Sequence, residues 1–146
     1  MRVREIMTDN PACCTAESNV REVARMMAEN DCGEIPVLDQ SSQPIGVVTD
    51  RDIACRVVGM GKDPDRTIAR DVMSSPVITA SPEDDVAECC EKMEQEQIRR
   101  VPVVDRNGAC CGMIAQADIA RAASERDVAE LLRDVSQPGH QPPHAS

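Results

Sequence analysis

The chain has 146 residues, of which 41% are hydrophobic and none is Phe, Tyr or Trp, and its formal net charge is −10. The negative charge argues against nucleic acid as a partner, and the lack of aromatic rings removes the platforms on which single-stranded bases stack. No apolar run approaches the roughly 18 residues of a membrane-spanning helix, so we expect no membrane segment. The polar start after Met1 has no apolar signal core, so we expect a cytoplasmic protein.

Eight cysteines are present, and six of them form the adjacent pairs Cys13–Cys14, Cys89–Cys90 and Cys110–Cys111. Without an export signal, disulfides are not expected. No C-x-x-C spacing occurs and both histidines lie near the C-terminus, so we predict no metal site. We interpret the cysteines as small buried hydrophobic residues, and a thiol redox or zinc protein stays open as an alternative.

The chain repeats itself with an offset of 66 residues. Met7 corresponds to Met73, and Asp52 corresponds to Asp118. The Ile-Pro-Val string at 35–37 likewise returns as Val-Pro-Val at 101–103. Such a period means one supersecondary unit used twice. We therefore expect two units related by approximate two-fold symmetry, with ligands binding at the seam between them.

Each repeat opens with a short turn followed by a brief apolar run, at residues 12–14 and 77–78, which predicts a short strand. A helix follows. Ser81 and Pro82 have the chemistry of an N-cap and a first helical residue, and residues 15–18 are the weaker equivalent. Apolar residues at helical spacing then predict an amphipathic helix in each repeat: Val20, Val23, Ala24 and Met27 in the first, and Val86, Cys89, Cys90 and Met93 in the second.

Two strands and a second helix complete each repeat. The first strands are residues 34–38 and 100–104, and the proline inside each implies an edge strand or the first residue of a strand. The hairpin turn is clearest at 105–108. The returning strands are residues 45–48 and 111–114, and the final helices begin at Thr49 and Ala115.

The predicted fold is therefore of the α/β (α+β) class, with two β-α-β-β-α repeats packed around a pseudo-two-fold axis. Beyond the second repeat, Ser124 can cap a further helix with an apolar stripe at Val128, Leu131, Leu132 and Val135. The expected organisation is a first repeat at 1–59, a linker at 60–69, a second repeat at 70–124, a C-terminal helix at 125–136 and a disordered tail at 137–146.

The strings at 33–37 and 46–52 resemble a CBS motif, named for cystathionine β-synthase. Those at 98–105 and 112–118 look like a second copy. Together they resemble a CBS pair, or Bateman module, over about residues 3–124. The resemblance implies an α/β disc with two clefts between its repeats. It also implies regulatory binding of adenosine compounds such as AMP, ADP, ATP or S-adenosylmethionine, assembly into dimers, and no catalysis.

In the family, a Gly-h-h-Thr/Ser-x-x-Asp motif serves the ligand, in which the hydroxyl meets phosphate and the carboxylate holds ribose hydroxyls. The first repeat matches this pattern with Thr49 and Asp52, whereas the second retains Asp118 but has Ala115 in place of the hydroxyl. The resemblance thus implies a main cleft with Thr49, Asp52, Asp50, Arg51, Ile35, Pro36, Ile6 and Met7. It implies a weaker second cleft with Asp118, Ala115, Val101, Pro102, Arg99 and Arg100.

Elementary chemistry agrees with this assignment. A strand that ends at a helix N-terminus offers free N–H groups and a positive dipole end to a phosphate. The backbone of Ile35 and Pro36 could meet an adenine edge, with aliphatic side chains covering its faces. Thr49 and Asp52 also form a capping-box variant that needs no ligand, so that interpretation stays open. Arg99 and Arg100 are either solvated or ion-paired, or they clamp a phosphate.

The sequence contains no constellation of catalytic side chains, so we expect no enzyme, no catalytic residue and no required cofactor. The main hypothesis is a stand-alone regulatory module that binds AMP, ADP, ATP or S-adenosylmethionine, forms a homodimer and signals in trans to an effector protein. A ligand-free dimerisation or interaction module is the alternative, and a thiol redox or zinc protein is the second.

Overall fold

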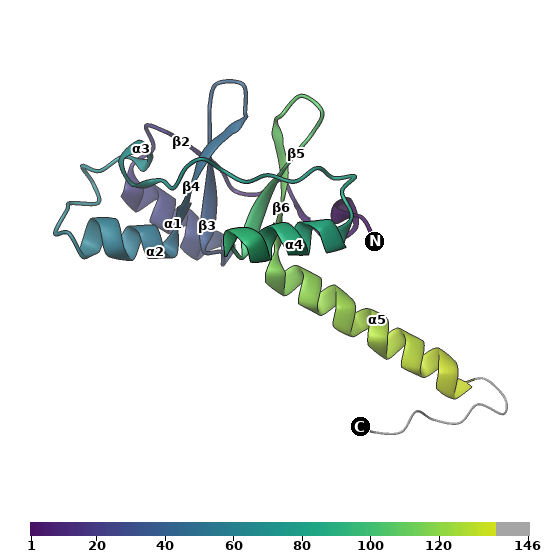
Figure 1. Ribbon diagram of the computed structural model, residues 1–146. Coiled ribbons are helices and arrows are strands. Elements are labelled where there is room, and N and C mark those ends of the chain that lie inside the picture. The colour runs from purple at the N-terminus through teal and green to yellow at the C-terminus, as the bar shows by residue number, and fades with distance from the viewer. Residues whose placement is uncertain (137–146) are drawn as a thin grey trace.

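The computed structural model describes the backbone of residues 1–136 and the side-chain surroundings of residues 1–126. The expected tail at 137–146 lies outside the described residues. Two three-stranded sheets stand side by side with helices around them (Figure 1), one in the order β2-β3-β4 and the other in the order β1-β6-β5. This arrangement confirms the α/β class and the use of one unit twice.

The first sheet and its helices are built mainly from the first repeat. The elements are β2 (Cys14–Thr15), α1 (Val20–Asn30), β3 (Glu34–Leu38), β4 (Pro44–Thr49) and α2 (Asp50–Ile53), which continues into a π-helical segment, Ala54–Val58. α3 (Ala69–Val72) packs on the same half.

The second half has the corresponding elements. They are a 3-10 helix (Val3–Glu5), β1 (Thr8–Asp9), α4 (Val86–Glu96), β5 (Arg100–Val104), β6 (Cys110–Ala115) and α5 (Gln116–Ser136). β3 with β4 and β5 with β6 form antiparallel hairpins. In the second hairpin the Asp105 carboxylate accepts N–H bonds from Asn107 (2.8 Å) and Ala109 (3.1 Å), as the turn chemistry predicts.

The two halves exchange their opening segments. β1, which starts the first repeat, pairs with β6 of the second through Thr8 and Met113, and Val3 is buried in the second core. Conversely, Val72 is buried in the first core, and the N–H of Val47 donates to the carbonyl oxygen of Ser74 (3.0 Å). The two cores therefore do not coincide with the two sequence repeats, and each needs residues from both.

A methionine lies on a glycine where each exchanged segment crosses the opposite sheet. A Cβ atom added at Gly112 would lie 2.6 Å from Sδ of Met7 and 3.1 Å from the carbonyl oxygen of Thr8. A Cβ added at Gly46 would lie 2.7 Å from Sδ of Met73. Real Cβ atoms do not approach other atoms so closely. The repeated glycines and methionines thus let the exchanged backbone lie directly on the strand.

Both long helices begin later than the capping signals suggest. Asn19 caps α1 by accepting the N–H of Arg21 (2.8 Å), and Asp85 caps α4 by accepting that of Ala87 (3.0 Å). The prediction of Ser81 as N-cap and Pro82 as first helical residue is wrong. The carbonyl oxygens of this turn instead accept the N–H groups of the exchanged N-terminal segment: Arg4 to Pro82 (3.0 Å) and Val3 to Asp84 (2.9 Å).

Two strand predictions also need correction. Residues 77–78 form no strand, and Ala80 instead makes an isolated bridge to Val103. Pro102 lies in β5 at the end of its sheet, as predicted, but Pro36 lies in β3, the middle strand. The middle position is tolerated because β2 pairs only with the last two residues of β3, so Pro36 has no ladder partner on that side.

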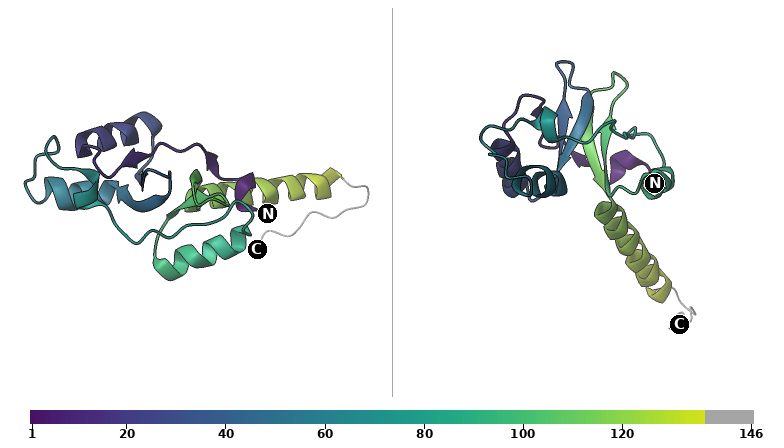
Figure 2. Two further views of the ribbon diagram at one scale, coloured as in Figure 1. Left: turned by 90° about the horizontal axis from the view of Figure 1, so that it is seen from above. Right: turned by 60° about the vertical axis from the view of Figure 1, so that its left-hand side comes forward.

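The predicted break at Ser124 is wrong, because α5 is one helix from Gln116 to Ser136 that leaves the body of the molecule (Figure 2). Ser124 lies inside it. No glycine or proline occurs between Gly112 and Pro138, and Ala, Glu and Arg around Ser124 are good helix formers. The expected apolar stripe from Val128 onward lies outside the described side chains. No helix within residues 1–136 has the length and apolar character needed to cross a membrane.

Gly112→Ala should lower the free energy of unfolding by about 1–3 kcal/mol, because the added methyl overlaps Met7 and a backbone carbonyl. The check is chemical denaturation of the single variants Gly112→Ala and Met7→Ala and of the double variant. Because Met7→Ala makes room for the methyl, the double variant should lose less stability than the two single variants lose together. Additive losses would show that the contact is not responsible.

Candidate functional site

The carboxylate of Asp52 is held by neighbouring groups of the protein. Thr49 ends β4 and caps α2: its Oγ1 accepts the N–H of Asp52 (3.0 Å), and Oδ2 of Asp52 accepts the N–H of Thr49 (2.9 Å). Asp52 is only 7% exposed, and Oδ1 also accepts the hydroxyl of Ser74 (3.1 Å) and lies 3.9 Å from Nε of Arg56. The capping box is therefore formed, and this carboxylate already has several partners within the protein.

The structure does not bring together all the residues expected in that cleft. Asp50 and Arg51 are exposed beside Asp52, whereas Ile35 and Pro36 are buried on β3. Ile6 and Met7 lie in the other half, packed on the second core, because the opening segments are exchanged. By the 66-residue offset their counterparts in the first half are Val72 and Met73, which pack in the first core, and the adjacent Ser74 donates to Asp52. The 66-residue offset relates Ser74 to Thr8, so the repeat indicates that the two residues are equivalent. That Ser74 lies beside Asp52 follows only from the exchange of the opening segments.

A cavity of about 500 Å³ lies at the other cleft, beside Asp118. Its walls come from both halves: the residues after β1, the C-terminal end of α1, the starts of β3 and β5, and the junction of β6 with α5. The lining residues that bear on its chemistry are Asp9, Asp31, Glu34, Arg100, Ala115, Asp118 and Arg121. The cavity thus lies at the cleft that the sequence ranks second.

Asp118 is held at the N-terminal end of α5. Its Oδ2 accepts the N–H of Ala115 (3.0 Å), and its Oδ1 lies 3.5 Å from the guanidinium of Arg121. Of the residues expected in this cleft, Ala115, Asp118 and Arg100 line the cavity. Val101 and Pro102 are buried, and Arg99 is exposed on a neighbouring hollow that it shares with Arg100.

Sequence reasoning missed Glu34, which the repeat offset pairs with Arg100. Glu34 is 8% exposed, and its Oε2 is buried without a hydrogen-bond partner. Burial raises the pKa of this carboxyl to about 7, against the opposing effect of Arg100; Asp52 and Asp50 raise it further. A carboxyl in this state changes its charge near neutral pH.

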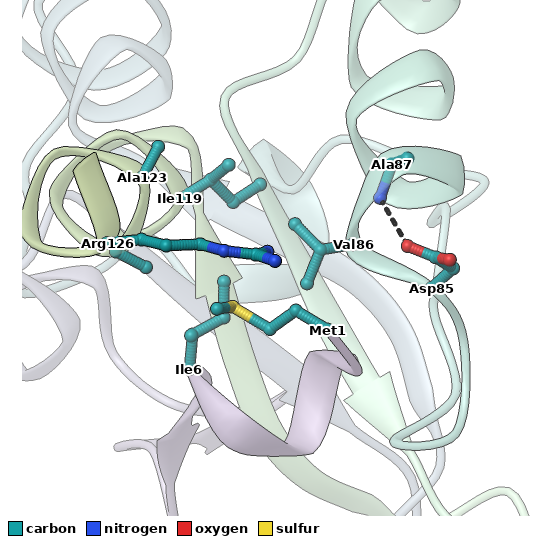
Figure 3. Close-up of a pocket in the computed structure, with 9 residues that line it drawn as sticks. Met1, Ile6, Asp85, Val86, Ala87, Ile119, Ala123 and Arg126 are labelled. Carbon is teal, nitrogen blue, oxygen red and sulfur yellow. Dashed lines mark hydrogen bonds between the residues drawn. The ribbon is translucent and has the colours of Figure 1, made fainter. Parts of the chain in front are cut away.

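A smaller cavity of about 300 Å³ lies near the N-terminus, and Figure 3 shows its lining. Ile6 lies there with Val86 of α4 and Ile119 of α5, so the residue expected at Asp52 contributes to a different hollow. Asp85 lies at the edge, where it caps α4. This hollow is mostly apolar and offers no carboxylate at the N-terminus of α5.

The chain belongs to the CBS domain family. The sequence model of the CBS domain matches it twice, at residues 3–59 and 69–125. The fold is that of a CBS domain pair, a class of regulatory module.

Two sequence relatives illustrate the family. The chain is 40% identical over 116 residues to the uncharacterized protein MK0525 of Methanopyrus kandleri, covering 80% of this chain and 57% of that protein. It therefore spans little more than half the length of that relative. It is 33% identical over 135 residues to the CBS domain-containing protein YhcV of Bacillus subtilis, covering 92% of this chain and 94% of YhcV.

Solved structures share the fold. The CBS domain pair of protein MJ0100, in complex with 5′-methylthioadenosine and S-adenosyl-L-methionine, matches with a TM-score of 0.78 at 25% identity, covering 86% of this chain and 98% of that one. PAE2072 of Pyrobaculum aerophilum, complexed with AMP, matches with a TM-score of 0.77 at 30% identity, covering 88% and 99%. Hypoxic Response Protein I with two coordinated zinc ions matches with a TM-score of 0.76 at 29% identity, covering 83% and 98%.

Glu34→Gln should stabilise the protein more at pH 8 than at pH 5. The folded-state pKa of Glu34, about 7, lies above the ordinary value of 4.5. The cost of burying its charge is therefore present above pH 7, shrinks as the pH falls through 7 and is gone below about 4.5. The difference corresponds to roughly 3 kcal/mol as an upper figure. Denaturation at both pH values measures it, and the exposed Glu29→Gln on α1 is the control. An equal effect at both pH values would contradict a raised pKa for Glu34.

Proposed function

We propose that the protein is a regulatory module that binds an adenosine-containing ligand in the cavity beside Asp118 and passes the binding event to a partner protein. The observation that carries this proposal is the cavity itself, which is built from both halves and has a carboxylate at a helix N-terminus. Its volume of about 500 Å³ lies in the range of small-molecule sites. The likeness to CBS pairs that hold AMP, methylthioadenosine and S-adenosylmethionine supports the class of ligand.

Asp118 would accept hydrogen bonds from the ribose hydroxyls. Its Oδ2 is engaged by the N–H of Ala115, which fixes the carboxylate at the cavity wall and leaves further lone pairs on both oxygens. Such charge-assisted bonds are among the stronger polar contacts in proteins. Asp52, the equivalent residue in the first cleft, already accepts the Ser74 hydroxyl and has less capacity for a ligand.

Binding at this place couples the ligand to the whole fold. Residues of both halves line the cavity, so a bound ligand stabilises their packing against each other. α5 also begins there, with Ala117, Asp118 and Arg121 on its first turns, and leads away from the body (Figure 1). A ligand that orders these turns would act on the element that reaches furthest toward a partner. Regulation is therefore the activity we propose, and catalysis is not.

The homodimer stays a prediction, and we expect its interface to involve the helices beginning near Val20 and Val86 and those after Asp52 and Asp118. In α1, Val20 and Val23 are buried in the first core, so these two side chains do not contribute to an interface. Two of the exposed large apolar side chains, Val58 (71%) and Met60 (69%), lie at the end of the helical segment that follows Asp52 and just after it. A ligand-free interaction module would use the same surface, so dimerisation alone does not distinguish the two functions.

Asp118→Asn should weaken binding of an adenosine ligand at least tenfold, because hydrogen bonds to a charged group contribute about 1.5–3 kcal/mol. The amide oxygen can still accept the N–H of Ala115, so the fold should be kept. Calorimetry measures the affinity, and circular dichroism checks the fold. Asp52→Asn is the matched control at the equivalent position and should weaken binding much less. The reverse order of the two effects would place the ligand in the first cleft.

A second candidate function, thiol redox sensing, is favoured by one contact. Cys13 and Cys110 come from different repeats, and their half-buried thiols act electrostatically on each other. The thiol of Cys13 donates to the carbonyl oxygen of Pro11 (3.2 Å), and that of Cys110 to the carbonyl oxygen of Gly112 (3.6 Å). The interaction of the two thiols raises the pKa of Cys13 well above its ordinary value and lowers that of Cys110 to about 7. The expectation of buried cysteines is confirmed for Cys14 and Cys89, whereas five others are half-buried and Cys55 is exposed. Within the described residues, no cluster of three or more ligating side chains could hold a metal ion.

Cys110 should therefore be the thiol most reactive toward iodoacetamide at pH 7, since the thiolate is the nucleophile. Removing the effect of the neighbouring thiol with Cys13→Ala should slow the alkylation of Cys110 at pH 7. Peptide mass spectrometry locates the label. Treatment with hydrogen peroxide should first give a sulfenic acid and water, and attack by Cys13 should then give the disulfide and a second water. Uniform labelling of all half-buried cysteines would remove this candidate.

A further inference from the structure

The charge of the cavity beside Asp118 points to one kind of adenosine ligand. Four acidic residues, Asp9, Asp31, Glu34 and Asp118, line the cavity together with only two basic residues, Arg100 and Arg121. A phosphate monoester carries about two negative charges near neutral pH and would face an excess of carboxylates. A ligand with positive charge would complement them.

The two arginines do not reverse this balance. The guanidinium of Arg121 lies 3.5 Å from Asp118, so part of its charge is already neutralised by a lining residue of the cavity. Arg100 lies beside Gly33, where an added Cβ would be 3.1 Å from its Nη2, and it acts electrostatically on Glu34. At the helix N-terminus, where a hydroxyl would meet a phosphate, Ala115 has none.

Glu34 adds an observation of a different kind. It is buried to nine-tenths, it lines the cavity, and its Oε2 has no hydrogen-bond partner in the protein. Unpaired buried oxygens are rare because they cost free energy, and they call for a donor that the protein alone does not supply. Oε2 is shielded from solvent, so a cationic group in the cavity would act on this carboxyl through its opposite charge.

We infer that this cavity selects an adenosine whose 5′ side carries a sulfonium or ammonium charge, as in S-adenosylmethionine, over an adenosine that carries phosphate. Glu34 is the residue whose carboxylate interacts with this charge. The inference rests on the proposed function. A neutral 5′-thioether such as methylthioadenosine lacks the charge and keeps the adenosine half, so it separates the two contributions.

Binding of a cation near Glu34 should depend on pH. A cation near Glu34 stabilises its ionised form, so affinity should rise as the pH increases through about 7. The charged groups that act on Glu34 are Arg100 on β5 and Asp50 and Asp52 on α2. The amine of S-adenosylmethionine titrates nearby, so the contribution of Glu34 is the part of the pH dependence that Glu34→Gln removes.

The test is calorimetry on the full chain at pH 6 and pH 8 with S-adenosylmethionine, methylthioadenosine, AMP and ATP. At pH 8 we expect S-adenosylmethionine to bind at least tenfold more tightly than AMP or ATP, with methylthioadenosine between them. Glu34→Gln should cost S-adenosylmethionine about tenfold and reduce its pH dependence, while methylthioadenosine changes little. The exposed Glu29→Gln on α1 is the control and should change none of the four affinities.

Different contrary results would contradict the ligand preference and the proposed function. Equal or tighter binding of AMP or ATP would overturn the inference and leave the proposed function standing. A Glu34→Gln variant that loses all four ligands alike would show a structural role for Glu34 and would also overturn it. If none of the four binds the wild-type chain, the proposed function fails, and this inference fails with it.

Discussion

The exchange of the two opening segments is the constraint on which the rest of the structure depends. Each sheet or core is complete only when the start of the other repeat lies on it, with Met7 on Gly112 and Met73 on Gly46. A half of about 60 residues would be only marginally stable alone. The exchange removes that problem because neither core exists without residues of both repeats, and it brings the two halves into a defined relation at their seam.

The chemistry at the seam between the two halves depends on the differences between the repeats. Pseudo-symmetry makes two clefts, but their contents are unequal: Glu34 corresponds to Arg100, and Thr49 corresponds to Ala115. In the first cleft the Asp52 carboxylate is engaged by Ser74. In the second, Asp118 borders a cavity of about 500 Å³ with an unpaired carboxyl oxygen in its wall. One fold used twice thus provides one cleft whose carboxylate is engaged within the protein and one whose carboxylate borders a cavity.

Much of this fold is predictable from local pattern. Glu34–Leu38 and Arg100–Val104 are strands with the predicted bounds, since each is a short apolar run bounded by polar residues. The caps of α1 and α4 were not predictable, because the expected cap turn at Ser81 is occupied by hydrogen bonds from a segment about 80 residues away. The exchange itself left no local signal. Both repeats carry the same opening pattern, which fits either sheet equally well.

The same limit applied to the site. The motif identified Asp52 and Asp118, but whether each faces a ligand or its own neighbours depends on contacts between repeats. The most direct measurement is hydrogen–deuterium exchange with and without a bound adenosine compound. We predict slower exchange at residues 8–12, 30–34 and 115–121 together, because these segments from both repeats line one cavity. Slowing confined to residues 49–52 and the neighbourhood of Ser74 would place the ligand in the other cleft and contradict it.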